Sequence, residues 1–224
     1  LGHLRKRLRR HFDRRGSGNS TVIGGGGNSV IYGGTGNDSL VAGSGPTTLR
    51  GGGGVDVIQG NATSWLVEAV PSNGGVAQTV TLTDDSFAAG SEQETLAGIS
   101  HFAVSLGSGQ YVLDASRTTG RLVLTGGTGS GTILAGSGDA TIAVGSGFQT
   151  IVGGTGHNTY VFGPSTRGSV TIRNAGDAAD TLDFSQFAAG IHLDLESTAP
   201  QAVSAGLLTL SIANPIAVNR VIGS

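Results

Sequence analysis

Large apolar side chains recur every nine residues in two stretches of the chain, and short glycine-rich segments separate them. The blocks of the first stretch begin at Arg15, and those of the second begin at Gly126. The glycine-rich half of each block predicts a turn, because glycine tolerates positive φ. The other half predicts a short strand with one inward side chain. These inward positions are Val22, Ile31, Leu40, Leu49 and Ile58, then Ile133, Ile142, Ile151 and Tyr160.

Turns and strands that alternate without hairpin spacing predict parallel strands wound in a coil. Two blocks complete one turn of such a coil, so residues eighteen apart are expected to lie directly above one another. The pattern therefore predicts an all-β solenoid with one row of apolar side chains on each inner face.

The best-formed blocks are Gly33–Val41 and Gly51–Gln59, which read GGTGNDSLV and GGGGVDVIQ. They resemble the RTX (repeats-in-toxin) nonapeptide family, whose consensus is G-G-x-G-x-D-x-U-x. The resemblance implies a right-handed parallel β-roll in which Ca²⁺ ions lie between stacked turns. Backbone carbonyls and the consensus aspartate would hold these ions. It also implies a protein similar to large secreted or surface-attached bacterial adhesins.

Aspartate occupies the consensus position in only two of the nine blocks, at Asp38 and Asp56. Because these residues are two blocks apart, we expect them to face one shared gap and to bind calcium there. The glycine-turn carbonyls expected to complete the site are those of Gly34, Gly36, Gly52 and Gly54. In the alternative reading, each aspartate caps its own turn without a metal. Gln149 and Asn158 hold this position in the second run, where we expect hydrogen bonds between turns instead of calcium.

Interruptions of the period predict five segments. They are a basic arm (1–14), a first repeat run (15–59), irregular strands that continue the solenoid (60–116), a second repeat run (117–163) and irregular strands leading into a further repeat (164–224). The last segment favours a chain that is a fragment of a larger protein.

The basic arm departs in charge from the rest of the chain. Residues 1–15 hold seven of the thirteen Lys and Arg residues and one acidic residue, so the rest of the chain carries a net negative charge. Helical spacing of apolar residues predicts a short amphipathic helix there. These residues are Leu1, Leu4, Leu8 and Phe12. Two roles stay open for it, a cap over the first turn of the solenoid and contact with an anionic membrane or a polysaccharide.

Composition narrows the class of protein. Glycine supplies 41 of 224 residues while 37% are apolar, which suits a thin-cored coil better than a disordered chain. Cysteine is absent, so no disulfide framework exists. No apolar run approaches the length of a membrane span, and the acidic body argues against nucleic acid as a partner. Neither H-E-x-x-H nor G-x-S-x-G occurs, and the histidines are scattered, so no enzyme is expected.

Together these features predict a non-enzymatic calcium-binding module of a secreted, extracellular or cell-surface protein. It would serve as an adhesin stalk or as a calcium-triggered folding segment in type I secretion. Calcium ions are the expected partners, with a cell-surface polysaccharide or a host surface as further candidates. The alternative is an accessory repeat domain of an extracellular hydrolase whose catalytic part lies outside this chain.

Overall fold

The computed structural model describes residues 16–223 except 73, 174–178 and 215–216. The regular elements in this part of the chain are β-strands, and no α-helix occurs there. The predicted all-β class is therefore confirmed. The amphipathic helix predicted within residues 1–14 lies outside the described residues.

The chain forms two compact units. The first contains the described residues up to Glu68, together with Val80–Ala103 and Thr119–Arg121. The second contains Ala69–Thr79, Val104–Thr118 and the described residues from Leu122 onward. The chain passes between the units within the strands β6 (Trp65–Val70), β7 (Gln78–Thr83), β10 (His101–Leu106) and β12 (Arg121–Thr125), and once more between Thr118 and Thr119.

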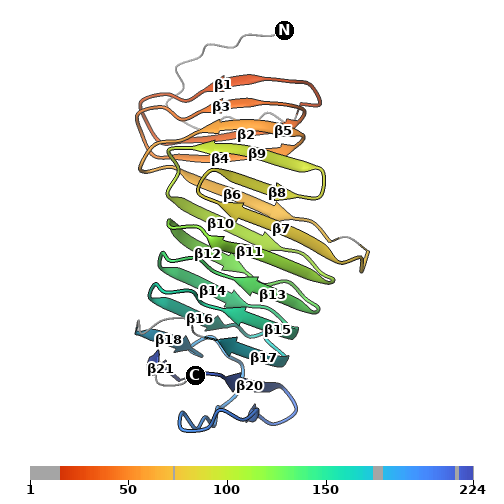
Figure 1. Cartoon of the computed structure of the whole chain (residues 1–224), viewed down its shortest axis with the longest axis vertical. Coiled ribbons are helices and arrows are strands. Elements are labelled where there is room, and N and C mark those ends of the chain that lie inside the picture. The colour runs from red at the N-terminus through yellow and green to blue at the C-terminus, as the bar shows by residue number, and fades with distance from the viewer. Residues whose placement is uncertain (1–15, 73, 174–178, 215–216, 224) are drawn as a thin grey trace. The chain divides into compact units, whose positions relative to one another are not determined.

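The first unit stacks its repeat blocks as two parallel sheets (Figure 1). One sheet contains β1 (Thr21–Ile23), β3 (Ser39–Val41), β5 (Val55–Gln59) and β9 (Glu92–Ala97), and the other contains β2 (Ser29–Thr35), β4 (Thr47–Gly53) and β6. In the first sheet, Val22 pairs with Leu40 and Leu40 with Ile58. The predicted stacking of residues eighteen apart is thus confirmed.

Four of the five predicted inward positions of the first run lie in the core of the first unit, whereas Val22 in the first strand is half-buried. Further core side chains come from 80–103, among them Leu82, Phe87 and Phe102. Ile31, Leu40, Leu49 and Ile58 are at most 1% exposed, and Leu66 of β6 extends the row. Each repeat contributes one such side chain, so the core is thin and depends on stacking between neighbours.

An antiparallel meander interrupts the coil. β8 (Ser86–Ala89) pairs antiparallel with both β7 and β9, a departure from the purely parallel coil expected for 60–116. The reason is local, because Asp84 and Asp85 form a tight turn between β7 and β8. β9 then pairs in parallel with β5, which restores the coil.

The second unit has the same architecture. One sheet contains β11 (Tyr111–Arg117), β13 (Gly131–Leu134), β15 (Gly147–Val152), β17 (Gly168–Arg173), β20 (Leu208–Ile212) and the antiparallel β19 (Gln201–Ser204). The other contains β12 (Arg121–Thr125), β14 (Ala140–Val144), β16 (Asn158–Phe162), β18 (Asp180–Asp183) and β21 (Val218–Ile222). Within its core, the ring of Phe162 stacks on that of Phe184, with centroids 4.2 Å apart.

Glycine is required in the turns for two reasons that act together. Gly34 and Gly52 have φ of 118° and 94°, which L side chains rarely adopt. A Cβ on Gly52 would also overlap the carbonyl oxygen of Gly34 in the preceding coil. The coils therefore stack closely at their turns only because these positions lack side chains.

Candidate metal centre

A column of side chains in the first unit follows the consensus aspartate position. Asp56 Oδ1 accepts a hydrogen bond from Asp38 N at 2.7 Å, and Asp38 Oδ1 accepts one from Ser20 N at 2.7 Å. Each carboxylate therefore reaches back one full coil to a backbone N–H. Asp38 is 3% exposed and Asp56 is fully buried.

The second oxygen of each carboxylate has no such partner. Asp38 Oδ2 and Asp56 Oδ2 are buried and accept no hydrogen bond. Burial is the main reason that the pKa of Asp56 rises to about 6, and repulsion from Asp38 adds to it. A buried carboxylate oxygen without a partner is costly, and a bound cation would remove that cost.

The glycine turns surround these free oxygens. A Cβ on Gly33 would overlap Asp38 Oδ2 and would lie 2.6 Å from the carbonyl oxygen of Gly51. Carboxylate and backbone oxygens thus converge where only glycine leaves space. Ca²⁺ prefers such a set of hard oxygen ligands, so the residues present fit a calcium ion.

Of the four carbonyls named from the sequence, those of Gly34 and Gly52 lie within β2 and β4 and not in the predicted turns, because parallel pairing continues through these glycines. Those of Gly36 and Gly54 follow directly after the two strands. Gly34 O and Gly36 O approach Gly52 and Gly54 of the next coil so closely that a Cβ there would overlap them. Gly54 O accepts a hydrogen bond from Gln93 N at 2.8 Å. Assignment of these carbonyls and of the two aspartates as calcium ligands remains a prediction.

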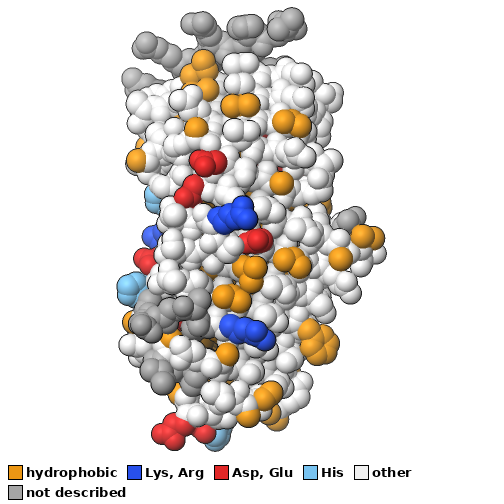
Figure 2. Space-filling view, in the orientation of Figure 1, with side chains coloured by type: hydrophobic (Ala, Val, Ile, Leu, Met, Phe, Trp, Pro, Cys, Tyr) orange, Lys and Arg blue, Asp and Glu red, His pale blue; other side chains and the backbone are white. Residues whose placement is uncertain are grey.

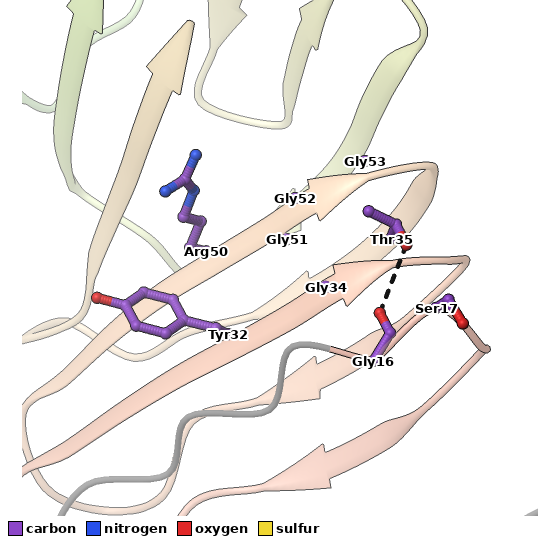
Figure 3. Close-up of a pocket in the computed structure, with 9 residues that line it drawn as sticks. All are labelled: Gly16, Ser17, Tyr32, Gly34, Thr35, Arg50, Gly51, Gly52 and Gly53. Carbon is purple, nitrogen blue, oxygen red and sulfur yellow. Dashed lines mark hydrogen bonds between the residues drawn. The ribbon is translucent and has the colours of Figure 1, made fainter. Parts of the chain in front are cut away.

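A groove of about 670 Å³ lies over the glycine segments of β2 and β4 (Figure 3). The side chains of Tyr32 and Arg50, which are register partners, project on one side of it. Thr35 Oγ1 donates a 3.5 Å hydrogen bond to Gly16 O at its other end. Gly51, which lines the groove, also borders the buried carboxylates, so solvent reaches the neighbourhood of the site from this side.

Sequence reasoning missed one member of the column. Glu94 of β9 is the register partner of Asp56 and is 3% exposed. The signal was present, because Glu94-Thr95-Leu96 repeats the acid, any residue, apolar order of Asp56-Val57-Ile58. The β7–β8 meander inserted before β9 places Glu94 outside the nine-residue period, and this hid the relation.

Among the remaining consensus positions, the polar side chains make hydrogen bonds, whereas Gly131 and Ala140 carry no polar side chain. In the first unit, Ser29 Oγ and Thr47 Oγ1 donate to carbonyls of their own turns. In the second unit, Gln149 Nε2 donates to Gly129 O at 2.7 Å, and Asn158 Nδ2 donates to Asp180 Oδ1 at 3.2 Å. The predicted hydrogen bonds of Gln149 and Asn158 between coils are present, although Asn158 bonds to strand β18 and not to a turn. The absence of calcium from this run stays a prediction.

Glycine turns, short parallel strands and buried aspartates stacked eighteen residues apart define a repeat solenoid with an acidic site between its coils. The family model of the RTX calcium-binding nonapeptide repeat (4 copies) matches residues 15–49 and 43–63. Residues 15–63 therefore carry RTX calcium-binding nonapeptide repeats, and repeats of this family bind calcium ions.

Two further findings bear on the class of protein. No curated protein matches the chain at a significant level. Within the described residues, no helix has the length and apolar character needed to cross a membrane.

Proposed function

We propose that the chain is a non-enzymatic module, a right-handed parallel β-roll that calcium orders within a secreted or cell-surface bacterial protein. In this proposal Asp38 and Asp56 bind the ion between their coils, and glycine carbonyls complete its shell. The module then acts as an adhesin stalk or as a segment that folds when the chain meets extracellular calcium.

The observation that carries the proposal is the pair of buried oxygens, Asp38 Oδ2 and Asp56 Oδ2, that accept no hydrogen bond beside the glycine turns. Without a cation, the two carboxylates repel each other in a buried environment. With a cation, the same charges hold successive coils together. Folding of the first run is therefore expected to depend on calcium, because the coils gain an attraction they otherwise lack.

The second repeat run supplies an internal comparison. None of its consensus positions carries a carboxylate, and the side-chain amides of Gln149 and Asn158 donate hydrogen bonds, so this run is expected to be stable without calcium. A roll with one calcium-dependent run and one independent run would keep a folded part at low calcium and extend its order when calcium rises.

Hydrogen exchange of the full chain, with calcium and with chelator, tests this proposal. Chelation is expected to speed exchange in residues 16–59 and to leave residues 126–161 unchanged. Metal counting after dialysis against calcium chloride gives the stoichiometry. Equal changes in the two runs, or no bound calcium, would contradict the proposal.

A further inference from the structure

A second group of carboxylates lies in the first unit beyond the consensus positions. One carboxylate oxygen from each of Glu68, Glu92 and Glu94 lies within 4.8 Å of the others. Glu68 and Glu94 are 1% and 3% exposed, and Glu92 is half-buried. β6 supplies Glu68 and β9 supplies the other two, so strands of both sheets contribute.

The backbone holds two of these groups in place. Gly51 N lies 3.2 Å from Glu68 Oε1 and 3.1 Å from Glu94 Oε1, and donates to both. A Cβ on Gly51 would overlap Glu94 Oε1 and Asp56 Oδ2. Asp56 therefore presents its free oxygen to the same small space, from the coil that precedes Glu94.

Oxygens aimed into this space are unpartnered. Glu94 Oε2 and Asp56 Oδ2 accept no hydrogen bond, although both side chains are at least 97% buried. The presence of unpartnered oxygens is an observation independent of the clustering. Carboxylates that served only to accept backbone hydrogen bonds would have every buried oxygen hydrogen-bonded.

The positive charge beside the cluster does not balance the negative charge of its carboxylates. Arg50 Nε lies 3.4 Å from Glu68 Oε2, and the Arg50 side chain is 40% exposed. One partly solvated guanidinium faces four carboxylates, of which three are buried. Buried carboxylates without enough positive charge beside them are costly, and a bound cation would remove that cost.

We propose that Glu68, Glu92 and Glu94, with Asp56, form a calcium site that continues the aspartate column across the break in the nine-residue period. Ca²⁺ binds oxygens at about 2.3–2.6 Å, so ligands on opposite sides of the ion are about 4.6–5.2 Å apart. The ligand oxygens of the three glutamates lie within 4.8 Å of one another, so one such ion can reach all three. The site lies between the coil of Asp56 and the coil of Glu94, whereas the proposed Asp38 site lies one coil earlier.

The acidic character of this site is internal. On the face of the molecule drawn in Figure 2, acidic side chains are few and scattered. Access runs past Arg50 and Gly51, which line the groove of Figure 3 and also touch the cluster. An ion at this site would thus link β6 to β9. The β7–β8 meander lies between these two strands in the sequence.

The decisive variant is the full chain with Glu68→Gln and Glu94→Gln together. Glutamine keeps an oxygen that accepts the Gly51 hydrogen bonds but removes both buried charges. Equilibrium dialysis against calcium chloride is expected to show a loss of about one bound ion per chain. In chelator, the midpoint of urea unfolding is expected to stay the same or rise, because buried charge has been removed.

Two controls separate this site from the proposed Asp38 site. Glu196→Gln changes an exposed glutamate and is expected to leave calcium binding unchanged. Asp38→Asn is expected to remove a different ion, so combining it with the double variant removes both. An undiminished ion count in the double variant overturns the proposal and leaves the glutamates as protonated structural groups. If the double variant fails to fold, Glu92→Gln at the half-buried ligand takes its place, and unchanged calcium affinity in that variant overturns the proposal equally.

Discussion

Replacement of Asp38 by asparagine separates the structural role of this side chain from calcium binding. Asparagine keeps an oxygen that can accept the 2.7 Å hydrogen bond from Ser20 N. A bond to a charged group is worth about 1.5–3 kcal/mol and a neutral one about 0.5–1.5 kcal/mol, so the exchange costs about 1 kcal/mol. Loss of the repulsion between Asp38 and Asp56 offsets this cost. In chelator, the Asp38→Asn protein is therefore expected to be about as stable as the wild type.

In calcium the two proteins are expected to diverge. A single site at a calcium concentration 100 times its Kd stabilises the native state by about 2.7 kcal/mol. With an m-value of about 1–3 kcal/mol/M in urea, this corresponds to a midpoint shift of about 1–3 M. The Asp38→Asn protein should lack this part of the calcium-dependent shift.

Urea unfolding followed by circular dichroism, with calcium and with chelator, measures both effects. Asp139→Asn is the matched control, because Asp139 is an exposed aspartate in a glycine turn that accepts a hydrogen bond from His157 N at 3.0 Å. The reasoning is refuted if Asp38→Asn and the wild type gain equally from calcium. A loss of several kcal/mol in chelator would instead show that Asp38 is a structural cap.

Two further expectations follow from the turns and from the second unit. Gly52→Ala should lower the free energy of unfolding by roughly 2–4 kcal/mol, because φ is 94° and the new Cβ overlaps Gly34 O. Gly53→Ala, whose new Cβ meets only ordinary contacts, should lower it by less than about 1 kcal/mol. Equal losses in urea unfolding would contradict the steric argument. Burial raises the pKa of Asp180 above its ordinary value of 3.8, so the folded state binds this proton more tightly than the unfolded state. The contribution of the bound proton to stability should be greatest below about pH 4 and should decline as the pH rises through the folded pKa. A stability difference between Asp180→Asn and the wild type that does not vary with pH would rule this out.

The repetitive part of the fold could be predicted because its determinants are local. One apolar residue and one glycine turn in every nine residues specify strand, turn and inward face within each block. The stacking of Val22, Leu40 and Ile58 then follows from the constant spacing alone. The same spacing places Asp38 and Asp56 next to each other in adjacent coils.

Pairing across the interruption depended on tertiary structure. Glu94 lies opposite Asp56 because the β7–β8 meander returns the chain to β5 in that register. Periodicity carries no information about where an insertion of arbitrary length rejoins a sheet. Glu68 reaches the same space from the other sheet, and its burial depends on the packing of Arg50 and Gly51. The sequence by itself thus determined the coil and its aspartate pair, whereas tertiary packing alone decided the gathering of the three glutamates, because side chains distant in sequence meet only where the folded chain returns them.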